Sequence, residues 1–235
     1  PEIKAFIEKS EPLNQKKYNS EELQKMYKLI KKYIDEDFKD FDKWRKNGEN
    51  DSKICQLIQK DSIDDFITFV NRKNYSLNNS IEPSIFETNP FLIEQKKDIS
   101  LIEYAAFFGS VQIFKYLYKN NVKLTKSLLS FAVHGQDEEI ILIIEENTKS
   151  EFQNGSFNDL ILPYITCMRE CIRCHHNDVA NYITQNHINI FNSEFDYVEF
   201  FTEISLIFYN FILLPEKNQD YQIMFYYACE NDYYA

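Results

Sequence analysis

The chain has 235 residues, 44% of them hydrophobic and 27% charged, which excludes general disorder and provides enough apolar side chains for a buried core. It contains only 4 glycines and 6 prolines, too few for the many tight turns of an all-β protein. The formal net charge of −11 disfavours nucleic acid as a partner, because a broad nucleic-acid-binding surface has to neutralise phosphates.

Residues 1–50 are expected to form an N-terminal helical cap. A short helix is predicted within 1–17, and the spacing of the apolar residues that follow predicts one long helix over 19–46. Asn47-Gly48 suits the end of this long helix. Its apolar stripe would either pack on the first repeat as a cap or dock a partner.

Residues 51–74 are predicted to form a pair of amphipathic helices with a turn at Asp61-Ser62. The next segment, 75–97, is rich in Asn and Ser and contains two prolines, which predicts an ordered connector. Within that connector, residues 84–86 suit a short helical turn.

The clearest helix pair is predicted over 100–121. Ala105 and Ala106 lie together on the apolar side of its first helix, which indicates close contact with a neighbouring helix. Gly109 follows that helix, where a left-handed turn would disfavour a residue with a side chain.

Similar pairs are predicted over 127–147 and 159–185. The alanine place is taken by Ala105, Ala132 and Cys171, and the glycine place by Gly109, Gln136 and His175. A further, partial repeat is expected over 193–235, with an apolar helix that Pro215 stops and one more helix at 221–234.

These residues resemble the ankyrin repeat. Residues 100–103 take its opening turn and the alanines and Gly109-Ser110 follow in order, while a later copy keeps Thr166 and the run 176–179. No proline follows the opening residue, and the glycine is lost in two copies. Taken whole, the chain resembles the divergent ankyrin-type proteins expanded in parasitic protists. The resemblance implies an all-α, ankyrin-like solenoid of stacked antiparallel helix pairs over 51–235.

The resemblance also implies that the first helices line a concave groove that binds another protein, without catalysis. An acidic chain would select a partner that carries basic groups. The partner-binding positions carried over from the family are Tyr104, Phe107, Phe108, Phe131, His134, Glu170 and Arg173. In the alternative interpretation, the aromatic members of this set pack between repeats.

Cysteine and histidine side chains gather in the 159–185 pair, and both are zinc ligands. The set is Cys167, Cys171, Cys174, His175 and His176. The three cysteines fall on one helix, and no second Cys/His cluster closes a tetrahedral site, so ordinary buried thiols are the simpler interpretation. A Cys–His nucleophile lacks an orienting carboxylate in the sequence. We therefore expect no catalytic residue, metal or cofactor, and keep a metal site or thiol enzyme as the lesser alternative.

The location and extent of the protein are expectations from the same residues. No apolar run reaches about 18 residues and no signal peptide is present, which predicts a cytoplasmic protein with no membrane span, and leaves a nuclear location as the alternative. Five cysteines, an odd number, favour free thiols over a disulfide framework. The chain begins at Pro1 and ends on an unpaired helix, so we expect a piece of a longer protein, which leaves a structural spacer as another possible function.

Overall fold

The computed structural model describes residues 30–31, 33, 40–95, 97–125, 127–152, 157–188, 197–210 and 212. Within these ranges helices alternate with turns and no strand occurs, which confirms the all-α class. None of the helices described is both long and apolar enough to cross a bilayer. The chain divides into two compact units, Pro1–Gln56 with Ser80–Ile99, and Leu57–Asn79 with Ser100–Ala235.

The first unit is built around the ring of Phe86. This buried side chain packs edge-on against Tyr33 and Phe41, with ring centroids 5.0 and 5.3 Å apart. The Asp51 carboxylate joins the same segments, because its Oδ1 accepts hydrogen bonds of 2.7 Å from both Tyr33 Oη and Ser84 Oγ. Residues from the expected connector therefore pack on the N-terminal region.

Two short helices in this unit differ from expectation. The single helix predicted over 19–46 is wrong at its C-terminal end, because Asp40 has a φ of +58° and a separate helix, α3 (Phe41–Asn47), begins after it. Gly48 ends α3 with a φ of +68°, as predicted. Helix α6 (Pro90–Ile93) was not predicted: Asn89 caps it through its side chain, and Pro90 suits its first position. The 1–17 helix and the start of the long helix lie outside the described residues.

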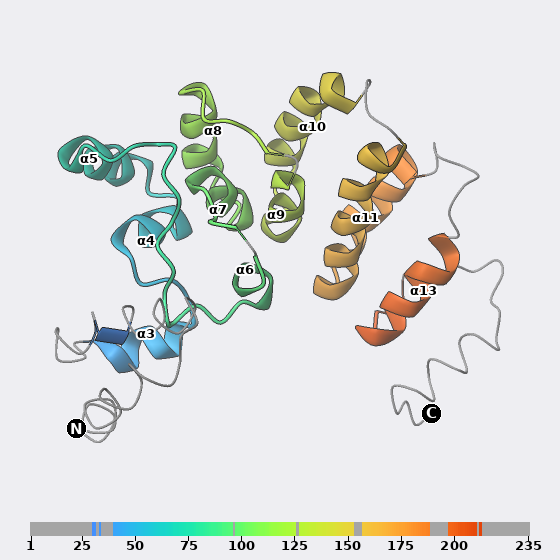
Figure 1. Ribbon diagram of the computed structural model, residues 1–235, viewed down its shortest axis with the longest axis horizontal. Helices are drawn as coiled ribbons and strands as arrows, with labels where there is room; N and C mark the ends of the chain where they lie inside the picture. Colours follow the sequence, from blue (N-terminus) through green and yellow to red (C-terminus); the bar gives the residue numbers. More distant parts are fainter. Residues whose placement is uncertain are drawn as a thin grey trace, which may run out of the picture. The chain divides into compact units, whose positions relative to one another are not determined.

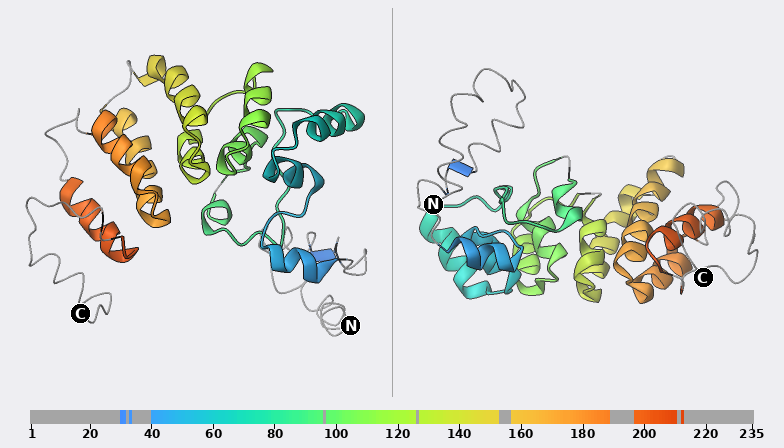
Figure 2. Two further views of the ribbon diagram at one scale, coloured as in Figure 1. Left: turned by 180° about the vertical axis from the view of Figure 1, so that it is seen from behind. Right: turned by 90° about the horizontal axis from the view of Figure 1, so that it is seen from below.

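Four helix–turn–helix pairs follow in chain order among the described residues. They are α4 (Lys53–Gln59) with α5 (Ile63–Lys73), α7 (Leu101–Phe107) with α8 (Val111–Lys119), α9 (Leu128–Gly135) with α10 (Glu138–Phe152), and α11 (Phe157–Cys174) with α12 (Asn177–Ile183), which the π-helix η1 (Thr184–Ile188) extends. Helix α13 (Tyr197–Ile207) comes last and is counted with the first helices, because the same kind of turn follows it. In the second unit the first helices α7, α9, α11 and α13 pack side by side in this order, and α8, α10 and α12 each pack on their own first helix (Figures 1 and 2).

The turn within each pair has the same backbone geometry. Each first helix ends at one residue with positive φ, which we call the turn residue: Asp61, Gly109, Gln136, His175 and Tyr209, with φ between +47° and +62°. The prediction that Gln136 and His175 occupy the glycine place is confirmed. After four of these turn residues the next N–H donates to a carbonyl five residues earlier, as Ser110 does to Ala105, which is the Schellman motif.

The residue after the turn residue reaches back to the preceding pair. Ser110 Oγ donates to the carbonyl of Ile58 (2.5 Å), His176 Nδ1 to that of Val133 (2.8 Å), and Asn210 Nδ2 to that of Ile172 (3.1 Å). Each accepting carbonyl lies three residues before a turn residue. Three chemically different donors therefore make one and the same contact between consecutive pairs.

The turn residues themselves reach forward to the next pair. The Asp61 carboxylate accepts from the N–H groups of Gln112 and Ile113, at 3.0 and 2.9 Å, and so caps α8 from the pair before it. His175 Nε2 donates to the carbonyl of Phe208 (3.0 Å). Consecutive pairs are thus held by hydrogen bonds that run in both directions along the row of turns.

Small residues let the first helices lie close together, as predicted. Ala105, Ala132 and Cys171 are all buried. The backbones of neighbouring pairs come closest at Gly109, which follows α7, and at Gly135, which ends α9. An added Cβ on Gly135 would lie 2.6 Å from the Gly109 nitrogen.

Two helix ends differ from the sequence boundaries. Helix α10 continues to Phe152, past the end of the pair predicted over 127–147. Helix α13 ends at Ile207, well before Pro215, because a turn residue, Tyr209, follows it. The apolar stretch predicted as one helix therefore contains a turn of the kind that follows α7, α9 and α11. The helix predicted over 221–234 lies outside the described residues.

Candidate functional site

Two of the predicted partner-binding aromatics are fully buried. All seven residues of α7 are buried, as are six of the eight in α9. Tyr104 and Phe131 are 0% exposed, and the Tyr104 hydroxyl accepts a hydrogen bond from Gln59 Nε2 (2.9 Å). These two side chains pack inside the protein, as the alternative interpretation expected, and present no surface to a partner.

The two remaining aromatics lie near the turn. Phe107 is 8% exposed and packs on the imidazole of His134, with ring centroids 4.7 Å apart. Phe108 is partly exposed and contacts the rings of Tyr104 and Phe107, at 4.8 and 5.0 Å. Phe107 thus forms one wall of a cluster centred on His134.

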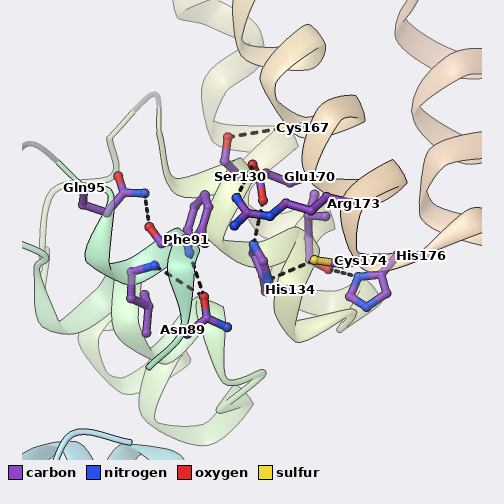
Figure 3. A network of polar contacts seen from close by, with 12 residues as sticks. Asn89, Phe91, Gln95, Ser130, His134, Cys167, Glu170, Arg173, Cys174 and His176 are labelled. Atoms are coloured by element: carbon purple, nitrogen blue, oxygen red, sulfur yellow. Dashed lines mark hydrogen bonds and ion pairs between the residues drawn. The ribbon is translucent and has the colours of Figure 1, made fainter. Parts of the chain in front are cut away.

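The cluster brings His134 together with Glu170 and Cys174 (Figure 3). His134 Nε2 lies 3.4 Å from Glu170 Oε2, and His134 Nδ1 lies 3.5 Å from Cys174 Sγ. His134 comes from the end of α9, whereas the other two lie four residues apart on α11 and so share one helix face. A potential metal-ligand atom from each of the three residues lies within 4.8 Å of the others.

Arg173 lies beside this cluster. Its Nη1 is 3.8 Å from Glu170 Oε1, and its guanidinium lies over the ring of Phe208, 5.9 Å from the centroid. The Arg173 side chain is 21% exposed, against 7% for that of Glu170. Four predicted site residues, Phe107, His134, Glu170 and Arg173, are therefore neighbours, although they form a partly buried cluster rather than an open groove.

His176 closes the turn beside the cluster. Its Nδ1 must carry the proton, because the carbonyl of Val133 can only accept, so its Nε2 accepts from Gln136 Nε2 at 2.6 Å. Burial is the main cause that lowers the pKa of His176, while the hydrogen bond to Val133 acts in the opposite direction. The lowered pKa favours the neutral ring that this pair of hydrogen bonds requires.

The cysteines and histidines considered as a zinc set do not converge. Cys167 and Cys171 are buried on α11, and Ser130 Oγ lies 3.6 Å from the Cys167 sulfur. Burial raises the pKa of Cys167 to about 12 and also raises that of Cys171. Only Cys174 of the three helix cysteines joins a group of potential ligands, and its two neighbours there, His134 and Glu170, were outside the set.

Thiol labelling should separate these cysteines. Burial and the nearby Glu170 carboxylate raise the pKa of Cys174 to about 11, but its side chain is partly exposed. We expect alkylation of native protein by iodoacetamide to modify Cys174 before Cys167 and Cys171, faster as the pH rises from about 7 to 9, because the thiolate is the reactive form. Cys167 and Cys171 should react only after unfolding. Peptide-resolved mass spectrometry measures each rate, and early labelling of Cys171 would contradict the burial described here.

Helix α11 differs from α7 and α9 because it has an exposed face. Thr166 and Arg169 are exposed and Arg173 is partly exposed, at the i, i+3 and i+7 spacing of a single stripe. Arg169 occupies the place held by Glu103 in α7 and Ser130 in α9, six residues before the turn residue, and both of these are buried. We call Thr166, Arg169 and Arg173 the α11 stripe.

Comparison with protein-family models, with curated proteins and with solved structures gives no match to this chain.

Sequence reasoning found His134 and Glu170 but assigned them to an exposed groove. It did not join them to Cys174, because that contact depends on how two helix pairs align in space. The turn residues of these pairs, Gln136 and His175, are 39 positions apart in the sequence. One signal was present: Glu170 and Cys174 stand four residues apart, which places both on one helix face.

Proposed function

We propose that the chain is a non-catalytic protein-binding module whose helix pairs form a divergent ankyrin-like stack. Support comes from the turn geometry that recurs after five helices and from the side-by-side packing of α7, α9, α11 and α13. Repeat architectures of this kind use their surfaces for binding more often than for chemistry, because each repeat contacts its neighbours and leaves extended faces to solvent.

The exposed α11 stripe is the observation that carries the proposal. The places of Arg169 on α7 and α9 are taken by Glu103 and Ser130, which are buried, whereas Arg169 itself is exposed on α11. Among these three helices α11 therefore offers a partner the most exposed first-helix face. Arginines are enriched at protein interfaces, because a planar guanidinium pairs with carboxylates through two parallel hydrogen bonds. The α11 stripe presents Arg169 and Arg173 in this way.

Local charge changes the kind of partner expected. The net charge of −11 favours basic partners over the whole surface, but charges act mainly within a Debye length of about 8 Å at physiological ionic strength. A segment docked on the α11 stripe lies next to Arg169 and Arg173. We therefore propose a partner with acidic side chains at this contact.

Charge reversal on the stripe tests the proposal. The Arg169→Glu chain is compared with wild type in affinity capture from the source cell lysate, followed by photo-crosslinking from residue 166. We expect a protein that crosslinks to the wild-type stripe to be lost at least about 10-fold from Arg169→Glu, because an attractive charge contact becomes repulsive.

Lys119→Glu is the matched control, since it makes the same charge change at an exposed position of α8. Loss from Arg169→Glu with retention by Lys119→Glu supports the stripe. Equal capture by all three chains would remove the stripe as the binding face, and an absence of any crosslinked protein would favour the spacer.

A further inference from the structure

Glu170 is the charged exception in a row of buried positions. Five residues before the turn residue stand Tyr104, Phe131 and Ile204 in other pairs, all buried and without charge, whereas Glu170 is a carboxylate that is only 6% exposed. Burial of a carboxylate is costly unless its oxygens are paired. Within the described residues Glu170 Oε2 accepts no hydrogen bond, although it points at His134.

The surrounding donors suit a divalent metal ion. We propose that His134, Glu170 and Cys174 bind one zinc ion, with an imidazole nitrogen, a carboxylate oxygen and a thiolate sulfur as ligands (Figure 3). These are the three ligand types that zinc takes in proteins, and the thiolate disfavours the harder magnesium and calcium ions.

The separations are close to those of a zinc site. Bonds of about 2.0 to 2.3 Å in a tetrahedron hold ligand atoms about 3.3 to 3.8 Å apart. Only one imidazole nitrogen can bind the ion, and Nε2, which lies 3.4 Å from Glu170 Oε2, falls in that range. The Cys174 sulfur lies 3.5 Å from the other nitrogen, Nδ1, and the limit of 4.8 Å for the whole set exceeds the range by about 1 Å. Rotation of the partly exposed Cys174 side chain can close that difference.

The charge balance also suits a partly buried place. A zinc ion with one thiolate, one carboxylate and a neutral imidazole has no net charge, so the loaded site avoids the cost of an unpaired buried ion. Binding releases the Cys174 thiol proton to solvent. Solvent can supply the fourth ligand from the side of Cys174, which is partly exposed, whereas His134 Nε2 and Glu170 Oε2 are buried.

Arg173 provides a way to distinguish a metal site from a simple ion pair. Its guanidinium is 3.8 Å from Glu170 and would repel a cation bound there. If Glu170 serves a metal, Arg173→Gln should keep or tighten metal binding. If Glu170 serves only its ion pairs, Arg173→Gln should create no metal affinity.

Cobalt titration of the whole chain, freed of metal with a chelator, tests the site. We expect one Co²⁺ per chain, with the thiolate-to-cobalt absorption band and the intense visible bands of tetrahedral cobalt, both displaced by zinc. Cys174→Ala should abolish the thiolate band, and Glu170→Gln should weaken binding at least about 10-fold, the loss that even outer-shell partners of a metal give.

The control is Cys171→Ala, which removes a thiol from the same helix at a place where Ala105 and Ala132 stand. This variant should bind cobalt like wild type. Zinc should also raise the unfolding midpoint of wild type but not of Cys174→Ala. Each chain is compared with itself in the presence and absence of zinc, so the result does not depend on the variant having wild-type stability. Absence of a cobalt band in wild type, or its persistence in Cys174→Ala, would overturn the proposal.

Discussion

Replacing Gly135 with alanine is expected to lower the free energy of unfolding by about 3 kcal/mol, the upper part of the range for overpacking a close contact. The reason is the close approach of two main-chain segments, one at Gly135 at the end of α9 and the other at Gly109 after α7. A Cβ on Gly135 would meet the carbonyl oxygen of Ala106 and lie 2.6 Å from the nitrogen and 2.9 Å from the Cα of Gly109. These are main-chain atoms, so no side-chain rotation relieves the contact. Urea unfolding followed by circular dichroism measures the loss.

Cys174→Ala is the matched control for Gly135→Ala. Both positions come directly before a turn residue, but Cys174 already carries a Cβ, so alanine there should change the free energy of metal-free protein by less than about 1 kcal/mol. If Gly135→Ala were equally mild, the two backbones would not be in the close contact described.

Replacing Glu103 with alanine is expected to cost about 3 to 5 kcal/mol, the usual loss when one partner of a buried charged network is removed. Glu103 is 1% exposed, and both oxygens of its carboxylate accept hydrogen bonds. Oε2 accepts from the backbone N–H and Oγ of Ser100, at 3.0 and 2.8 Å, while Oε1 accepts from Thr125 Oγ1 and Ser127 Oγ, at 2.8 and 2.9 Å. The side chain thereby ties the start of α7 to the segment that leads into α9.

Denaturant midpoints for three variants separate this network from a general effect of charge. Glu103→Gln should lower the free energy of unfolding less than Glu103→Ala, because the amide keeps one acceptor oxygen. It should still be less stable than wild type, because the amide NH2 group faces groups that also donate. Glu146→Ala, on the exposed side of α10, should stay within about 0.5 kcal/mol of wild type. A mild Glu103→Ala would show that water can replace the carboxylate.

The sequence predicted the helix pairs well because their signals are local. Apolar spacing and small residues mark the helices, and Gly109, Gln136 and His175 were aligned correctly as turn residues although only one is glycine. The Tyr209 turn was missed, since an apolar run on both sides of it resembles one continuous helix. The break at Asp40 was missed for the same reason.

The candidate site was predictable only in part. The analogy with a repeat family predicted Tyr104 and Phe131 as partner-binding positions, with packing between repeats as the alternative. Burial depends on what packs against a helix, and apolar periodicity does not show this for a helix that is covered on all sides. The meeting of His134 with Cys174 depends on how two pairs align in space. The number of residues between the two pairs depends on the length of the connection that joins them, which varies from pair to pair.

The backward hydrogen bond between consecutive pairs leaves unusual freedom to mutation. Ser110, His176 and Asn210 all supply a donor to the same kind of carbonyl, so hydroxyl, imidazole and amide are interchangeable in this role. The contact depends on the presence of a donor rather than on one amino acid. A substitution that keeps a donor of suitable reach should therefore keep the interface between pairs, even where the residue type changes.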